Sequence, residues 1–219
     1  MLKRCVAEAI GTFGIVFFGC GAIMVAERFP GAVSPAAISV VFGLVVTAMI
    51  YTLGHISGAH FNPAVTLAFA ITRHFPFRSV LLYWVAQCVG SFVAASLLCL
   101  ILPQGIGHGE TVPHVPLLQA FIWEVILTFM LMFVVMGVAK DTRAVGTLAG
   151  VVIGATVMIT AFVAGPITGD SMNPARSLGP AIISGRVDVL WLYILAPMVG
   201  AVLGALVYQW MRGEREPHS

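Results

Sequence analysis

Two short polar triplets stand out in a chain that otherwise offers few residues for chemistry. Asn-Pro-Ala occurs at Asn62–Ala64 and again at Asn173–Ala175. Asparagine is a favoured helix cap, and proline at the first helical position loses no hydrogen bond that the helix needs. Each triplet therefore predicts a helix start whose asparagine caps with its side-chain oxygen. We expect the amide donors of Asn62 and Asn173 to stay free for the oxygen of a passing small molecule.

Other groups that could do chemistry are sparse. Ser57 and His60 are close in the sequence, but no oxyanion motif or third partner accompanies them, so we expect no enzyme activity. The cysteines lack metal-ligand spacing and are read as small apolar residues. They all lie in apolar runs: Cys5, Cys20, Cys88 and Cys99. The sequence predicts no metal site and no cofactor.

Composition sets the environment in which the triplets work. The 219 residues are 59% hydrophobic and 9% charged, with a mean hydropathy of +1.01, whereas soluble domains carry roughly 25% charged residues. A membrane span needs about 20 apolar residues, and six runs reach that length. The sequence therefore predicts an all-α integral membrane protein, with residues 1–219 as one domain. The spans are expected near Cys5–Ala26, Pro35–Gly54, Ser79–Leu102, Leu117–Ala139, Val145–Ala164 and Leu190–Met211.

The basic residues predict the orientation, because cytoplasmic loops hold an excess of Lys and Arg. Six spans put both termini on one side. The opposite side holds only Arg28 and Arg186, and Arg176 is not counted for either side. We therefore expect both termini in the cytoplasm. The net charge of +2 follows from this topology and does not indicate nucleic-acid binding. The residues on the basic side are Lys3, Arg4, Arg73, Arg78, Lys140, Arg143, Arg212 and Arg215.

Internal similarity predicts the architecture. "AEAIGTF" at 7–13 matches "WEVILTF" at 123–129, and "ISGAHFNPA" at 56–64 matches "ITGDSMNPA" at 167–175. Two repeats, about 1–102 and 117–211, thus hold three spans each, and an odd number of spans inverts the second repeat relative to the first.

The residues after each triplet, Val65–Thr72 and Arg176–Ile183, are too few to cross a bilayer. They predict two half-helices whose N-termini meet at the midplane around a pore. Those N-termini carry partial positive charge, which opposes cations and protons. No phosphate-binding loop or carboxylate relay is present to drive uphill transport. The sequence therefore favours passive conduction of small neutral molecules.

The triplets, the inverted halves, an acidic residue in the first span of each half (Glu8, Glu124) and the arginine after the second triplet (Arg176) together resemble the aquaporin or major intrinsic protein family. "YTLGHISGAHFNPAVTLAFA" and "VAGPITGDSMNPARSLGPAI" are most similar to the plant nodulin-type branch and its bacterial relatives. The resemblance implies a homotetramer of independent pores in the plasma or inner membrane, surrounded by lipid.

Several polar residues have expected supporting roles. Glu8 and Glu124 are intramembrane acids, and we expect them to accept hydrogen bonds from the loop backbone beside the half-helices. His55 and His60 are expected to fix backbone or to border the cytoplasmic side of the pore. Arg176 is costly to bury in a membrane unless it lines the pore, so we expect it at the outer constriction. Residues 103–116, with Pro103, Pro113 and Pro116, are candidates to cover the outer mouth.

The resemblance places a selectivity filter at Phe42, Ala161, Asp170 and Arg176. Water-selective members usually carry histidine where this chain has Ala161, so a wider filter is expected. The Asp170 carboxylate either reaches the lumen and pairs with Arg176, or braces the loop while its backbone faces the pore.

The filter favours a channel for water and small neutral solutes such as glycerol, urea, boric acid or arsenous acid. A water-selective aquaporin is the alternative. An ion channel is the more remote one, since Asp170 could weaken the barrier to cations.

Overall fold

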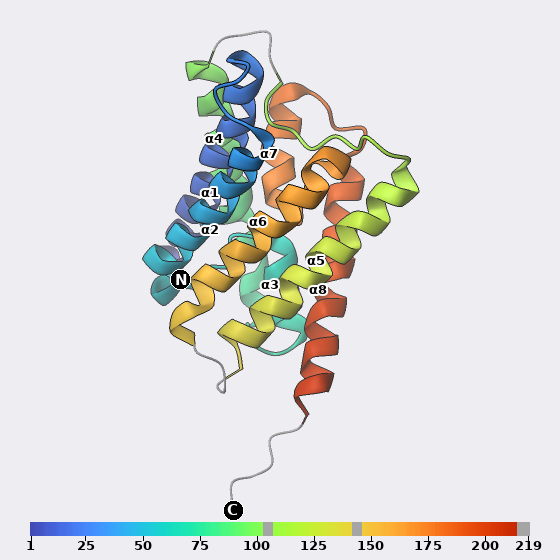
Figure 1. The fold of residues 1–219 in the computed structure, drawn as a ribbon. Helices are drawn as coiled ribbons and strands as arrows, with labels where there is room; N and C mark the ends of the chain where they lie inside the picture. The colour runs from blue at the N-terminus through green and yellow to red at the C-terminus, as the bar shows by residue number, and fades with distance from the viewer. Residues whose placement is uncertain (103–106, 142–145, 214–219) are drawn as a thin grey trace, which may run out of the picture.

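The computed structural model describes residues 1–102, 107–141 and 146–213 as a bundle of helices (Figure 1). Arg143 and Arg215, used above for orientation, lie outside these described residues, as do Pro103 and the expected start of the fifth span at Val145. The α-helices are α1 (Leu2–Arg28), α2 (Pro35–Ser57), α3 (Pro63–Ile71), α4 (Val80–Ile101), α5 (Leu117–Ala139), α6 (Ala149–Thr168), α7 (Pro174–Ser184) and α8 (Leu190–Arg212). Short 3₁₀ turns, Phe77–Ser79 and Gly146–Leu148, precede α4 and α6.

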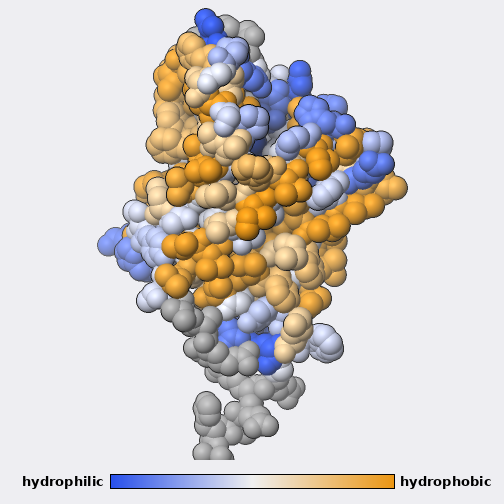
Figure 2. Space-filling view, in the orientation of Figure 1, coloured by the Kyte–Doolittle hydropathy of each residue, from blue (hydrophilic) through white to orange (hydrophobic). Residues whose placement is uncertain are grey.

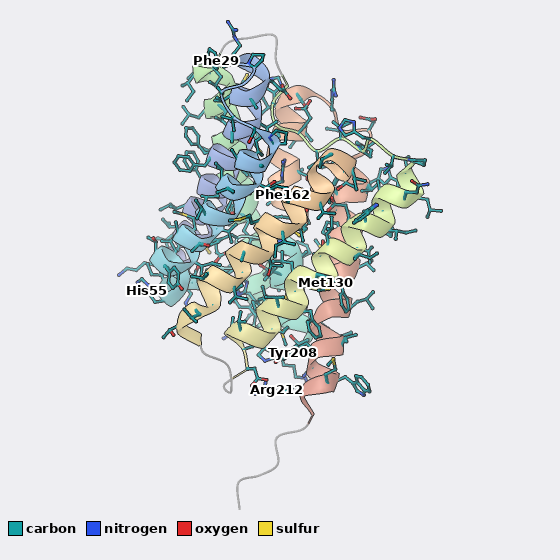
Figure 3. All side chains as sticks on the ribbon, in the orientation of Figure 1. Phe29, His55, Met130, Phe162, Tyr208 and Arg212 are labelled. Carbon is teal, nitrogen blue, oxygen red and sulfur yellow. The ribbon has the colours of Figure 1, made fainter. Side chains whose placement is uncertain are left out.

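Within the described residues, six helical segments are long and apolar enough to cross a membrane, which confirms the predicted fold class. Large apolar side chains point outward along them, including Leu44 on α2, Ile159 on α6 and Leu195 on α8. Figure 2 shows hydrophobic residues over the broad middle of the α5–α6 face and hydrophilic ones mainly toward its two ends. Met130 and Phe162 lie on this face, on α5 and α6 (Figure 3). The apolar band is the surface that lipid tails contact.

The two remaining helices, α3 and α7, begin at the prolines of the triplets. They have 9 and 11 residues, which at 1.5 Å per residue spans roughly half of the hydrocarbon core. Most residues of both helices are buried, those of the first two turns above all, so protein surrounds the interrupted backbone next to their N-termini. This burial is what allows non-helical chain to persist at membrane depth.

Equivalent helix contacts recur in the two halves of the chain. α1 packs against α4 as α5 packs against α8, and α2 packs against α6 across the halves. Each half-helix packs on the last span of the other half: α3 on α8 and α7 on α4. In Figure 1, α7 lies in the upper part of the bundle and α3 in the lower part. This exchange supports the two repeats proposed from the sequence.

Matched glycines let the paired helices approach closely. A Cβ at Gly90 on α4 would overlap the backbone carbonyl of Ala9 on α1, and a Cβ at Gly200 on α8 would overlap that of Val125 on α5. Backbone contact of this kind is how small residues hold membrane helices together, because lipid provides no hydrophobic drive between them.

A methyl group added at Gly90 therefore tests this packing. Gly90→Ala is expected to lower the free energy of unfolding by about 1–3 kcal/mol, the usual range for overpacking, seen as a lower melting temperature in detergent. Gly165→Ala on α6 is the control, because a Cβ there meets open space and alanine favours a helix. Equal melting temperatures for the two variants would contradict the proposed packing.

Candidate solute pore

The two Asn-Pro-Ala triplets meet and are cross-linked by their asparagines. The Asn62 side-chain oxygen accepts from the Ala64 N–H at 2.9 Å, and the Asn173 oxygen accepts from the Ala175 N–H at 3.1 Å, so both cap their helices as predicted. The amide nitrogens are not wholly free, however, which corrects the expectation above. Asn62 Nδ2 donates to the Met172 carbonyl at 2.7 Å, and Asn173 Nδ2 donates to the Phe61 carbonyl at 2.9 Å.

One donor remains on each asparagine after these crossed bonds. A primary amide has two N–H groups, and each cross-link uses one of them. Both asparagines line the same internal cavity. A single N–H from each residue is therefore available to a molecule in this cavity, and the crossed bond fixes its direction.

The chain just before each triplet is held in an uncommon conformation. Ala59 and Phe61 have φ values of 52° and 49°, and Asp170 and Met172 have values of 45° and 50°. Non-glycine residues rarely adopt this left-handed region, and each one costs free energy. The surrounding contacts must therefore impose this backbone.

Glu8 is the residue that holds the first of these loops. Its carboxylate accepts from the backbone N–H groups of His60 at 3.0 Å and Phe61 at 2.6 Å, and from the Ser57 hydroxyl at 2.6 Å. The Gln87 amide adds a further bond at 2.8 Å. Glu8 is completely buried, so four donors compensate the carboxylate for the loss of water.

Glu124 does the same for the second loop. It accepts from the N–H groups of Ser171 at 3.0 Å and Met172 at 2.9 Å, and from the Thr168 hydroxyl at 2.7 Å. These contacts correspond one by one to those of Glu8 with His60, Phe61 and Ser57. They support the structural role that the sequence suggested for both acids.

Two tyrosines complete the support, and the sequence analysis missed them. Tyr83 donates to the Ser57 carbonyl at 2.7 Å, and Tyr193 donates to the Thr168 carbonyl at 2.6 Å. Each bond ties the end of α2 or α6 to α4 or α8. Their equal place in the two repeats was the signal in the sequence that could have found them.

Among the described residues, two cavities share part of their lining, and this shared part is the constriction of the candidate pore. The inner cavity, of about 340 Å³, extends from Lys140 past both asparagines. The outer cavity, of about 820 Å³, opens beyond it. The lining residues that the two cavities share are Phe42, Asp170 and Arg176, three of the four expected filter positions. The fourth, Ala161, lines the outer cavity.

Arg176 forms one wall of this constriction and is 1% exposed. Its Nη1 donates to the Gly109 carbonyl at 2.7 Å, and its guanidinium carbon lies 5.2 Å from the centre of the Phe42 ring. Within the described part of the chain, Nε and Nη2 have no hydrogen-bond partner. Two unpaired donor atoms of a buried cation therefore lie where the linings of the two cavities meet.

Asp170 adopts neither of its two expected arrangements fully. Within the described residues it forms no ion pair with Arg176, which excludes the first arrangement for this conformation. One carboxylate oxygen lies 3.5 Å from the Thr160 hydroxyl, a long contact, and the other has no partner there. The residue still lines both cavities, so its unpaired oxygen and the unpaired Arg176 donors belong to the same part of the lining.

The two histidines have different surroundings. His60 is buried, lines the inner cavity and places its Nδ1 atom 3.1 Å from the Thr66 hydroxyl. His55 is exposed near the end of α2, at the outside of the bundle (Figure 3). The structure therefore does not bring His55 to the pore, because its helical position turns it away from the bundle centre.

Lys140 stands at the inner end of the pore, just beyond α5. Its ammonium lies 4.4 Å from the centre of the Phe69 ring on α3. Burial lowers the pKa of this ammonium group. The ring face offsets part of the lost hydration of the cation.

Comparison with known proteins agrees with this site. The profile of the family described as Major intrinsic protein matches residues 1–208, and the chain belongs to this family. It is 49% identical to Nodulin-26 of Glycine max, over 100% of this chain and 81% of that protein. It is 48% identical to Aquaporin NIP2-1 of Oryza sativa subsp. japonica, over 99% of this chain and 73% of that protein.

A solved structure shares the fold. The aquaglyceroporin from Plasmodium falciparum superposes with a TM-score of 0.85 at 27% identity, covering 94% of this chain and 95% of that one. The relatives are channel proteins, so this chain is a membrane channel and not an enzyme.

The carboxylate at Glu124 can be tested by removing one of its two acceptor oxygens. Glu124→Gln keeps the shape but leaves at least one of three buried donors unpaired, which costs about 1–3 kcal/mol. We expect a clearly lower melting temperature in detergent. Glu27→Gln is the control, because Glu27 is exposed and accepts from the loop residue Gly107. Unchanged melting of Glu124→Gln would refute its role in holding the loop.

Proposed function

We propose that this protein is a passive channel for small neutral solutes as well as water. The observation that carries the proposal is the methyl side chain of Ala161 on the outer cavity, next to the constriction formed by Phe42, Asp170 and Arg176. A histidine here would fill space and add a donor. The small side chain leaves room for a molecule larger than water.

The polarity of the constriction fits a hydroxylated solute. Arg176 offers two unpaired donors and Asp170 one unpaired acceptor, while Phe42 provides an apolar wall. A neutral molecule with several hydroxyl groups can replace its lost water with these partners. Glycerol, urea, boric acid and arsenous acid are the proposed solutes. One solved relative is by its title an aquaglyceroporin, which supports a pore wide enough for such molecules.

Exclusion of ions is proposed to rest on fixed positive charge. The N-termini of α3 and α7 meet, and each contributes a partial positive charge. The buried Arg176 adds a full charge further out. Cations and hopping protons therefore meet a barrier at two levels of the pore.

The remaining proposals concern assembly and placement. Independent pores are proposed to assemble as a homotetramer in the plasma or inner membrane, with both termini in the cytoplasm. The described basic residues Lys3, Arg78 and Lys140 support this orientation. They lie at the start of α1, before α4 and after α5, which are on the same side of the membrane in a six-span topology.

Ala161→His tests the solute route. Fast re-swelling of proteoliposomes by glycerol and boric acid is expected for the wild type and should fall at least about tenfold in the variant, while osmotic water flow persists. Stopped-flow light scattering measures both. Ala161→Gly is the control and should keep solute entry. Fast water flow without solute entry in the wild type would instead identify a water-selective aquaporin.

An ion channel is the second candidate, favoured by the unpaired Asp170 oxygen at the constriction. In planar bilayers we expect no cation current from the wild type, because the Arg176 cation and the N-termini of α3 and α7 together outweigh the single carboxylate of Asp170. Arg176→Val should admit a cation current, and Arg176→Lys, which keeps the charge, should not. A wild-type cation current would overturn the proposed exclusion of ions.

A further inference from the structure

The position of Arg176 depends on a segment that precedes α5 and lies over the outer cavity. Gly109 accepts the Arg176 hydrogen bond, and its φ of 68° suits glycine. A Cβ at Gly109 would press on the backbone of Cys20 in α1, so the segment lies directly against the bundle. Contacts that hold residues 107–114 in place therefore also hold the Arg176 guanidinium in place.

Thr111, two residues after Gly109, anchors this segment to the filter. Its hydroxyl donates to the Ser177 hydroxyl at 2.8 Å. Ser177 directly follows Arg176 on α7 and is 0% exposed. The contacts thus close a ring, from the guanidinium to Gly109, along the chain to Thr111, and across to Ser177 beside the Arg176 backbone.

Thr111 also touches the other side of the filter. A Cβ built on Gly169 would lie 3.2 Å from the Thr111 Cα and 3.3 Å from its methyl carbon. Gly169 immediately precedes Asp170. Thr111 therefore lies against both chain segments that supply polar groups to the constriction.

The ring continues inward to the second triplet. Ser177 and Ser171 hydroxyls are 2.6 Å apart, and the Ser171 hydroxyl donates to the Asn173 carbonyl at 3.1 Å. Because Thr111 donates to Ser177, the Ser177 hydroxyl can donate to Ser171, and the Ser171 hydroxyl to Asn173. Each hydroxyl in this series then has a partner for its proton. These side chains are buried, so water does not compete with the chain of bonds.

We propose that Thr111 and Ser177 form a positioning pair that sets the selectivity of the filter. Neither residue is placed to touch a solute at the constriction. They hold the Gly109 carbonyl so that Arg176 presents Nε and Nη2 in one fixed direction. Loss of the hydroxyl contact lets the guanidinium move, and a filter with a loose arginine distinguishes solutes less sharply.

The test measures how sharply the channel distinguishes solutes, and it rests on the proposed function. Proteoliposomes are assayed with glycerol, urea and erythritol, and the ratio of the highest to the lowest permeability is taken. Thr111→Val keeps the shape and loses the hydroxyl. It should reduce this ratio by about threefold or more, as expected from loss of one neutral hydrogen bond, while water flow and the melting temperature stay near those of the wild type.

Three further variants separate the hydroxyl contact from packing. Thr111→Ser retains the hydroxyl and should restore the ratio. The double variant Thr111→Val/Ser177→Ala should match the lower single variant, because residues that share one contact are not additive. Thr156→Val is the matched control, since the hydroxyl of this half-buried threonine donates within its own helix, to the Val152 carbonyl at 2.9 Å.

The outcomes decide between the proposals. A wild-type ratio in Thr111→Val, a ratio in Thr111→Ser as low as in Thr111→Val, or additive effects in the double variant would each overturn the positioning pair. If Thr111→Val does not fold, Ser177→Ala alone must lower the ratio, and an unchanged ratio there overturns the proposal as well. A wild-type protein that conducts neither water nor solute would instead refute the proposed function.

Discussion

The structure depends on one constraint: at membrane depth, every polar backbone group that leaves a helix needs a partner inside the protein. Two loops leave the helical pattern here, before α3 and before α7. Each passes over a buried carboxylate, Glu8 or Glu124, that accepts its N–H groups. Without these acceptors, the half-helices could not begin in the middle of the bundle.

The same constraint explains why the pore is polar only at certain points. Donors and acceptors of the loops are largely used in holding the loops themselves. The polar groups left unpaired at the constriction are the Nε and Nη2 atoms of Arg176 and one oxygen of Asp170, within the residues described. The inner cavity has polar lining residues at Asn62, Asn173, His60 and Lys140, and apolar side chains such as Ile15, Val65 and Leu131 lie between them. The lining therefore alternates between a few polar groups and apolar side chains.

Much of the fold could be predicted from the sequence because its signals are local. Six apolar runs give the spans, and the Asn-Pro pairs give the starts of α3 and α7 by capping chemistry alone. The inverted arrangement followed from counting three spans in each repeat. The ends of helices were less certain: α2 continues to Ser57 and α6 to Thr168, beyond the apolar runs, because Glu8 and Glu124 accept hydrogen bonds from these two polar residues inside the bundle.

The parts of the site that could not be predicted are those made by residues far apart in the chain. The crossed bonds from Asn62 and Asn173 need the other repeat. The Gly109 carbonyl that holds Arg176 comes from a connecting segment whose prolines suggested a cover for the outer mouth but not a contact with Arg176. His55 shows the opposite error. Its closeness to the triplet in sequence suggested a shared role, but its position on α2 turns the side chain to the outside of the bundle. The side-chain direction of Asp170 depends on a left-handed backbone, which alternation of residue types does not reveal.

The crossed asparagine bonds also bear on how the chain is made. Asn62 is synthesised long before Met172, whose carbonyl accepts its hydrogen bond. Phe61 is likewise synthesised long before Asn173, which donates to its carbonyl. The first re-entrant loop therefore enters the bilayer without its final partners and has to remain hydrated or sheltered until the second repeat arrives. Completion of the lumen is thus a late event of biogenesis, because it needs the chain before α7 in the second repeat. Neither half of the protein, made alone, would possess a finished channel lining.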